Sequence, residues 1–338
     1  MNFTLGKINN IWCIDLDIYL PPNFDIENLS GFFSQIDACA QINDITLDFS
    51  TLTYSWPTGM LVFGMKLRQW ISRRKILGLS TYHRNVTAQK TVQSYLMHLG
   101  FFDFIGIPKG NEVNAVSGSS SYLPIRRICR TDLDVEKLFD SINEEARKLA
   151  GVISGSFDDS ETLRTYQYSI RELIRNVFEH SQAEECYVCG QRWQSGRVEF
   201  AIIDAGVGIC STLSTQYELN SDSEALLMAI RPGISRTNGF RDNENIYDNS
   251  GFGLFVLSEL GKNFGWFCLG SGTARIVGTE SIASHEGYAM NGTFFGARFN
   301  RAPHNFRQVL HEIIESGEAE ADVTGIARRA SGKTRFLE

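Results

Sequence analysis

Three polar residues follow one another at four-residue intervals: Glu172, Asn176 and His180. They lie in a segment, 161–182, whose apolar residues are spaced three and four apart, which predicts a helix with one buried stripe. Residues four apart lie almost above one another on a helix, so the three polar side chains share an edge of that stripe. An amide oxygen suits Mg²⁺, and a carboxylate can accept a proton from an attacking water. The pattern indicates magnesium–nucleotide chemistry, although a solvated helix edge would explain this helix alone.

A second group of residues follows the strand predicted for 198–204. The sequence there is Asp204-Ala205-Gly206-Val207-Gly208-Ile209. Glycines at a strand end let the backbone turn sharply and approach a flat ligand closely. The Asp204 carboxylate could then accept a hydrogen bond from an exocyclic amine, although an ordinary strand-ending turn has the same composition.

A third group, Asn249-Ser250-Gly251-Phe252-Gly253-Leu254, leads into a helix predicted for 252–263. The first N–H groups of a helix have no partner within the helix, and its dipole is positive at that end. Glycines leave room for phosphate oxygens there, so this segment is a candidate anion site. A lone Gly-x-Gly before a helix is common, and its weight comes from the order of all three groups.

That order resembles the GHKL ATP-binding family, which includes gyrase, heat-shock chaperones, histidine kinases and the mismatch-repair ATPase. It consists of Glu-Leu-x-x-Asn on a helix, Asp-x-Gly-x-Gly-Ile after a strand, a long loop ending in Gly-x-Gly-Leu, and Gly292-Thr293 on a late strand. The match covers roughly residues 130–300. It implies an α/β sandwich with helices on one face of a mixed sheet, ATP between the helices, and a lid from about Pro232 to Ser250.

The resemblance also implies a role for each matching residue. Glu172 would be the general base, Asn176 the Mg²⁺ ligand, and Asp204 the acceptor for the adenine amino group. Gly206 and Gly208 would lie against the base, and Thr293 would support Asp204 or the adenine. The full set implied for ATP binding is Asn176, His180, Asp204, Gly206, Gly208, Ile209, Ser250, Gly251, Phe252, Gly253, Leu254 and Thr293.

The N-terminal half is similar to STAS domains, the fold of anti-sigma-factor antagonists. The similarity lies in a strand at 45–49, a turn at 52–59 and a helix that starts at Pro57. In that family the turn carries a phosphorylatable serine. Pro57 stands at the matching position here, with Thr58 beside it, so phosphorylation of Thr58 or Ser55 is left open and the domain is expected to serve in docking.

The elements that must position these groups alternate between strand and helix, which predicts an α/β protein. A Gly/Ser/Asn-rich stretch at 110–121 indicates a domain boundary. We therefore expect a STAS-like domain at 1–110, a linker at 111–129, a GHKL domain at 130–304 and a C-terminal helix and tail at 305–338.

Composition excludes several classes of protein. The chain has 338 residues and a net charge of −7, so it has no overall positive field to hold nucleic acid or anionic lipid. No apolar run is long enough to cross a membrane and no signal peptide is evident, so we expect a cytoplasmic protein. Its seven cysteines are scattered, and Cys186 and Cys189 of the one CxxC read as strand core rather than as a metal or redox pair.

Three functions are consistent with these residues. The first is an Mg-dependent ATPase whose lid drives a conformational switch in bacterial signalling or defence. The second is a serine/threonine kinase of the anti-sigma type acting on a STAS partner, and the third is an ATP-gated binding module without turnover. We expect a protein partner and, by analogy with the family, a homodimer.

Overall fold

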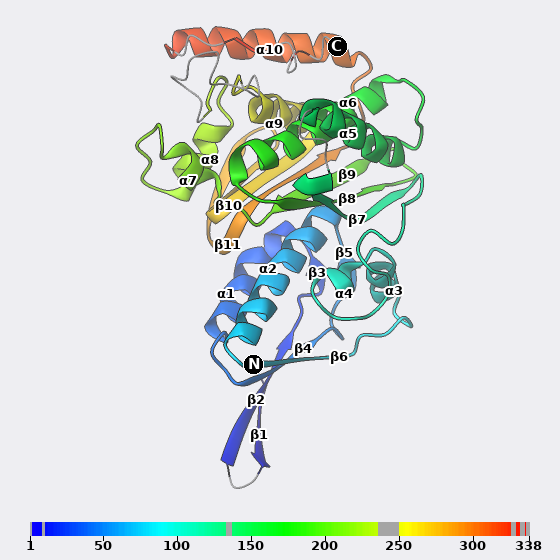
Figure 1. Cartoon of the computed structure of the whole chain (residues 1–338), viewed down its shortest axis with the longest axis vertical. Coiled ribbons are helices and arrows are strands. Elements are labelled where there is room, and N and C mark those ends of the chain that lie inside the picture. Colours follow the sequence, from blue (N-terminus) through cyan, green and yellow to red (C-terminus); the bar gives the residue numbers. More distant parts are fainter. Residues whose placement is uncertain are drawn as a thin grey trace.

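The computed structural model describes residues 2–8, 11–132, 137–235, 250–325, 329–331 and 335, and it has a mixed α/β architecture (Figure 1). In the N-terminal half, the main sheet has the strand order β1-β2-β4-β6. Strands β2, β4 and β6 are parallel, and β1 pairs antiparallel with β2. The elements of this half are β1 (Asn2–Ile8), β2 (Ile11–Tyr19), β3 (Asn23–Phe24), α1 (Leu29–Ala38), β4 (Asp44–Asp48), β5 (Tyr54–Ser55), α2 (Pro57–Ile76), β6 (Ser80–Arg84), α3 (Thr91–His98) and α4 (Phe101–Phe104).

The second half is built on a sheet in the order β10-β11-β9-β8-β7, in which each neighbouring pair is antiparallel. Its strands are β7 (Tyr122–Cys129), β8 (Glu185–Arg192), β9 (Val198–Asp204), β10 (Gly265–Gly278) and β11 (Ile282–Phe299). Its helices are α5 (Leu138–Ser154), α6 (Glu161–Asn176), α7 (Ile209–Leu213), α8 (Asp222–Ala229), α9 (Gly253–Phe264) and α10 (Phe306–Val323).

The second sheet is covered on both faces. Helices α5, α6 and α9 lie on one face, with α10 beyond them, and α1 and α2 of the N-terminal half lie on the other (Figure 1). Strand β9 shows this directly, because all of its residues are buried. Phe200 and Ile202 join the core under α6, whereas Ala201 and Ile203 join the core that contains α2.

One buried carboxylate holds the start of α2 against β9. Glu199 is fully buried, and its Oε1 accepts a hydrogen bond of 3.0 Å from the Thr58 N–H in the first turn of α2. A negative charge is favourable at a helix N-terminus. The other oxygen, Oε2, accepts from Arg298 Nε of β11 at 2.8 Å, and the Arg298 guanidinium lies 4.2 Å from the Trp56 ring centroid.

Further polar contacts join the two halves along α2. Lys66 Nζ donates to the Ala289 carbonyl of β11 at 2.6 Å, and Gln69 Nε2 donates to the Asn291 carbonyl at 3.0 Å. The Cys189 thiol of β8 lies 3.3 Å from the Pro57 carbonyl. The N-terminal half is therefore a fixed layer of the fold in this structure.

The α/β class is confirmed, and three finer expectations are wrong. The second sheet is antiparallel rather than mixed, and helices cover both of its faces because the N-terminal half packs on the face expected to be bare. Residues 122–129 of the expected linker form β7, which pairs with β8. The strand-core interpretation of the CxxC is confirmed, since Cys186 and Cys189 are both buried in β8, in different cores.

Among the helices that the structure describes, none is both long enough and apolar enough to span a bilayer.

Replacing Glu199 tests whether this carboxylate fixes the N-terminal half. We expect Glu199→Ala to lower the free energy of unfolding by about 3 kcal/mol. The substitution leaves the Arg298 guanidinium without its carboxylate partner and removes the acceptor for the Thr58 N–H at the start of α2. The matched control is Glu144→Ala on α5, where an exposed carboxylate lies 3.1 Å from Lys148. Its loss should cost less than about 1 kcal/mol. Urea denaturation followed by tryptophan fluorescence measures both, and equal values would contradict the role given to Glu199.

Candidate functional site

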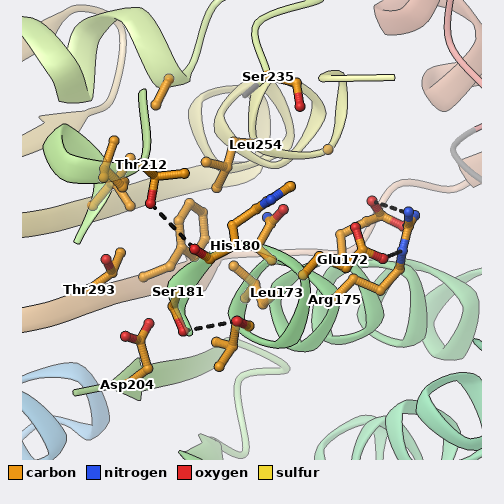
Figure 2. A pocket seen from close by; sticks show the side chains of 18 of the residues that line it. Glu172, Leu173, Arg175, His180, Ser181, Asp204, Thr212, Ser235, Leu254 and Thr293 are labelled. Carbon is orange, nitrogen blue, oxygen red and sulfur yellow. Dashed lines mark hydrogen bonds and ion pairs between the residues drawn. The ribbon is translucent and has the colours of Figure 1, made fainter. Parts of the chain in front are cut away.

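A pocket lies between α6, the turn after β9 and the start of α9 (Figure 2). It brings together residues that are far apart in the sequence. The residues expected from the sequence that line it are Glu172, Asn176, His180, Asp204, Gly208, Ile209, Ser250, Gly251, Gly253, Leu254 and Thr293.

The helix that carries the first group is not regular to its end. Ser160 caps α6 by accepting from the Leu163 N–H at 3.1 Å, and the α-helix runs to Asn176. Residues Val177–Ser181 then form a π-turn, a wider turn that is frequent at functional sites. The predicted spacing on one helix edge is therefore confirmed for Glu172 and Asn176. His180 lies in the wider turn, where its carbonyl accepts a hydrogen bond from Thr212 Oγ1 at 3.4 Å.

Asp204 lies at one end of the pocket, where β9 ends. It is only 3 % exposed, and no Lys, Arg or His among the described residues forms an ion pair with it. Burial raises the pKa of Asp204 to about 6, against hydrogen bonds from the Gly206 and Thr293 backbone N–H groups and from the Ser181 hydroxyl, which lower it. A buried carboxylate without a cation is costly, so this acceptor is arranged for a neutral donor.

The turn after Asp204 is fixed from behind by β10 and β11. Ser271 Oγ accepts from the Ile209 N–H at 3.0 Å and donates to the Gly292 carbonyl at 2.9 Å. Gly292 has a φ of 96°, and a Cβ there would lie 2.0 Å from the Asp204 carbonyl oxygen. Only glycine allows β11 to approach Asp204 so closely, which is how Thr293 reaches it with a backbone N–H.

Two residues of the expected set lie elsewhere. Gly206 does not line this pocket, because it packs on the π-turn, where a Cβ would lie 2.1 Å from the Ser181 carbonyl oxygen. Phe252 is fully buried in the core and makes an edge-to-face contact with Phe255. Both residues serve packing in this structure, and their expected contact with a ligand stays a prediction.

Glu172 lies at the opposite end of the pocket in a buried group of charges (Figure 2). Its Oε1 accepts from Arg171 Nη2 at 2.9 Å and from Arg175 Nη1 at 3.2 Å, and Arg175 Nε donates to Glu179 at 2.9 Å. Burial favours the neutral carboxyl, but Arg175 and Arg171 prevail and hold the pKa of Glu172 below its ordinary value. Glu172 is therefore ionised but a weakened base.

The start of α9 faces this carboxylate. A Cβ on Gly253, the first residue of α9, would lie 2.8 Å from Glu172 Oε2, so the helix N-terminus lies against the acid. Gly251 has a φ of 76°, and a Cβ there would meet the Ile234 carbonyl oxygen at 2.6 Å. Gly251 is thus required by close backbone approach, whereas Gly253 leaves room for the Glu172 carboxylate. The N-terminus of a twelve-residue helix opens into the pocket.

Asn176 is the candidate metal ligand, and its environment fits that role. Its Nδ2 is buried and has no hydrogen-bond partner among the described residues, so the amide is not committed to a contact within the protein. Among the residues that the structure describes, no three His, Cys, Asp or Glu side chains lie close enough together to hold an ion by themselves. Mg²⁺ usually keeps waters and binds to one or two protein oxygens together with substrate phosphates, so the Asn176 side-chain oxygen could serve as one such ligand.

Sequence reasoning missed several lining residues. Arg175 and Glu179 lie three and seven residues after Glu172, a spacing that places them on the same helix face. Ser181, Thr212 and Ser235 come from the π-turn, α7 and the segment after α8, and short local patterns gave no signal for them. Most of the expected lid, about Pro232 to Ser250, lies outside the described residues, which do not include 236 to 249.

The chain matches no protein-family model and no curated protein.

The burial of Asp204 predicts a pH-dependent stability difference. Its pKa of about 6 lies above the reference value of 3.8, so the folded protein binds the proton more tightly than the unfolded chain does between these values. This contribution to stability is present at low pH and is lost as the pH rises through 6. Relative to Asp204→Asn, the wild type should therefore lose on the order of 2–3 kcal/mol between pH 4 and pH 7. Urea titrations of both proteins at several pH values measure this, and a constant difference would contradict it.

Proposed function

We propose that this pocket binds ATP with Mg²⁺, in the manner implied by the resemblance to the GHKL family, and that the chain is an ATPase whose nucleotide state drives a conformational switch. The observation that carries the proposal is Asp204, a buried carboxylate without a cation at one end of a pocket whose other end holds a helix N-terminus. Few ligands need both a neutral donor and an anion site, and ATP has both.

The Asp204 end supports recognition of adenine. A carboxylate accepts a hydrogen bond from the exocyclic amine of adenine, whereas guanine would present a carbonyl oxygen to it and repel it. Ile202, Leu269 and Phe295 line the same pocket and supply apolar surface for a flat ring. Protonation of Asp204 removes its charge and makes it a weaker acceptor, so binding should weaken as the pH falls through about 6.

The opposite end supports the phosphates and the metal. The backbone at Gly251 and Gly253 and the Ser250 side chain lie where the first N–H groups of α9 open into the pocket. Asn176 would hold Mg²⁺ through its side-chain oxygen. When bound, the ion supplies charge neutralisation at the phosphate oxygens.

Glu172 would take the proton of an attacking water in hydrolysis. Its contacts with Arg171 and Arg175 keep it ionised and oriented but lower its basicity, so slow turnover is expected in this arrangement. The same contacts favour a second candidate, an ATP-gated binding module that does not hydrolyse its ligand.

The N-terminal half bears on the kinase alternative. Ser55 and Thr58 are buried, with 6 % and 1 % exposure, and Thr58 lies against Gly296 of β11. A kinase could not reach either hydroxyl without separating α2 from the sheet. We therefore favour the switch over self-phosphorylation, and a protein partner, a homodimer and a role in bacterial signalling or defence stay predictions.

Calorimetric titration with MgATP, MgADP and MgGTP tests the proposal. Wild type should bind both adenine nucleotides and not MgGTP, and Asp204→Ala should weaken MgATP binding at least tenfold, on the order of one strong hydrogen bond. In Asn176→Ala, the affinity for ATP should no longer depend on Mg²⁺. Glu172→Ala should bind MgATP without releasing phosphate.

The control is Asp222→Ala, whose carboxylate lines a separate hollow and bonds to Thr273. It should bind MgATP as wild type does. Wild type that binds no nucleotide would overturn the proposed function, and binding without phosphate release would select the module that does not hydrolyse ATP.

A further inference from the structure

The group of charges around Glu172 is buried and contains two cations and two anions. Arg171, Glu172, Arg175 and Glu179 are each at most 5 % exposed at the side chain, and their formal charges cancel. These four side chains together therefore add no net positive charge to the N-terminus of α9 beside them. An anion bound beside Glu172 would compete with the two carboxylates for the arginines.

The two arginines differ in what they can do. Arg171 does not line the pocket, and its guanidinium lies over the rings of Phe139 and Tyr168, at 5.6 and 5.1 Å from their centroids. Arg175 lines the pocket and reaches both oxygens of Glu172 through Nη1, at 3.2 and 3.4 Å. Its own anchor is elsewhere, at Nε, which donates to Glu179.

We propose that Arg175 is a phosphate-sensing residue that exchanges Glu172 for the terminal phosphate of the nucleotide. The guanidinium can keep its Nε bond to Glu179 while Nη1 turns from the carboxylate to a phosphate oxygen, because arginine forms charge-assisted hydrogen bonds with both kinds of acceptor. Glu172 is not stranded by this exchange, because Arg171 continues to bond to its Oε1.

The exchange links binding to basicity. With Arg175 on Glu172 the carboxylate is held by two cations, and with Arg175 on phosphate it is held by one. A carboxylate that loses a neighbouring cation becomes a better proton acceptor. Arrival of the terminal phosphate would therefore release the base that hydrolysis needs, and a diphosphate too short to reach Arg175 would leave it locked. This inference rests on the proposed function.

Affinities for adenosine, MgADP and a non-hydrolysable MgATP analogue, measured on the full chain, test the exchange. Arg175→Gln should weaken the triphosphate about ten- to a hundredfold while adenosine binding changes less than about twofold, because a charge-assisted hydrogen bond to phosphate is lost. Arg175→Lys should restore part of the loss. The matched control is Arg164→Gln, because Arg164 lies on the same helix but pairs with Asp159 and Glu161 and does not line the pocket. It should leave the ratio of triphosphate to adenosine affinity unchanged.

Glu172→Gln gives a second readout that a structural role would not produce. Neutralising the competing carboxylate frees Arg175, so the triphosphate should bind several-fold more tightly than to wild type, and the double variant Glu172→Gln/Arg175→Gln should lose that gain. This arm decides the matter if Arg175→Gln does not fold. The exchange would be overturned if a folded Arg175→Gln keeps the wild-type ratio of triphosphate to adenosine affinity, or if Glu172→Gln gains no triphosphate affinity. In either case the proposed function would still stand if wild type binds adenosine and MgADP. Wild type that binds none of the three ligands would overturn both.

Discussion

Burial of β9 on both faces is the constraint on which the rest of this structure depends. Its even-numbered residues lie under α6 and end in Asp204 at the pocket, and its odd-numbered residues lie on α2 and include Glu199. A single strand therefore carries the candidate adenine acceptor on one side and the anchor of the N-terminal half on the other. Neither half can move without disturbing the strand that supports both.

The two buried carboxylates of β9 differ in how far their surroundings compensate the negative charge. Glu199 is satisfied within the protein, by the N-terminus of α2 and by Arg298. Asp204 receives hydrogen bonds but no cation from the residues that the structure describes, and its raised pKa reflects that incomplete compensation. A fold that fully pairs one acid and leaves the other short of charge has placed the second where a ligand can complete it.

The sequence predicts much of this arrangement, for identifiable physical reasons. The alternation of Val198, Phe200 and Ile202 in the apolar run 198–204 predicts a strand, whose bounds agree with the structure. The spacing of Glu172, Asp204 and Gly253 within the resemblance identifies segments that the fold does bring together. The covered second face was not predicted, although Glu199 inside that apolar run was a signal for it. A charge there requires a buried partner from another element.

Other features leave no local trace in the sequence. The π-turn at Val177–Ser181 has the composition of an ordinary helix, and its close contact with Gly206 involves a residue outside the helix that the local pattern does not include. Phe252 lies between the glycines of the third motif, and sequence position alone cannot show that its ring turns to the core. The Arg175 contacts depend on side-chain direction within a buried group, which the four-residue spacing does not specify.

The double burial of β9 also determines which motions the molecule can make. Each of its edges is hydrogen-bonded, to β8 on one side and to β11 on the other, and neither face meets water. Its amide protons can exchange with solvent only when the whole sheet opens, whereas the π-turn and the start of α9 can open locally. The base of the pocket, formed by β9, should therefore open more slowly than its rim, formed by the π-turn and the start of α9. A ligand could reorder this rim while β9 keeps its structure.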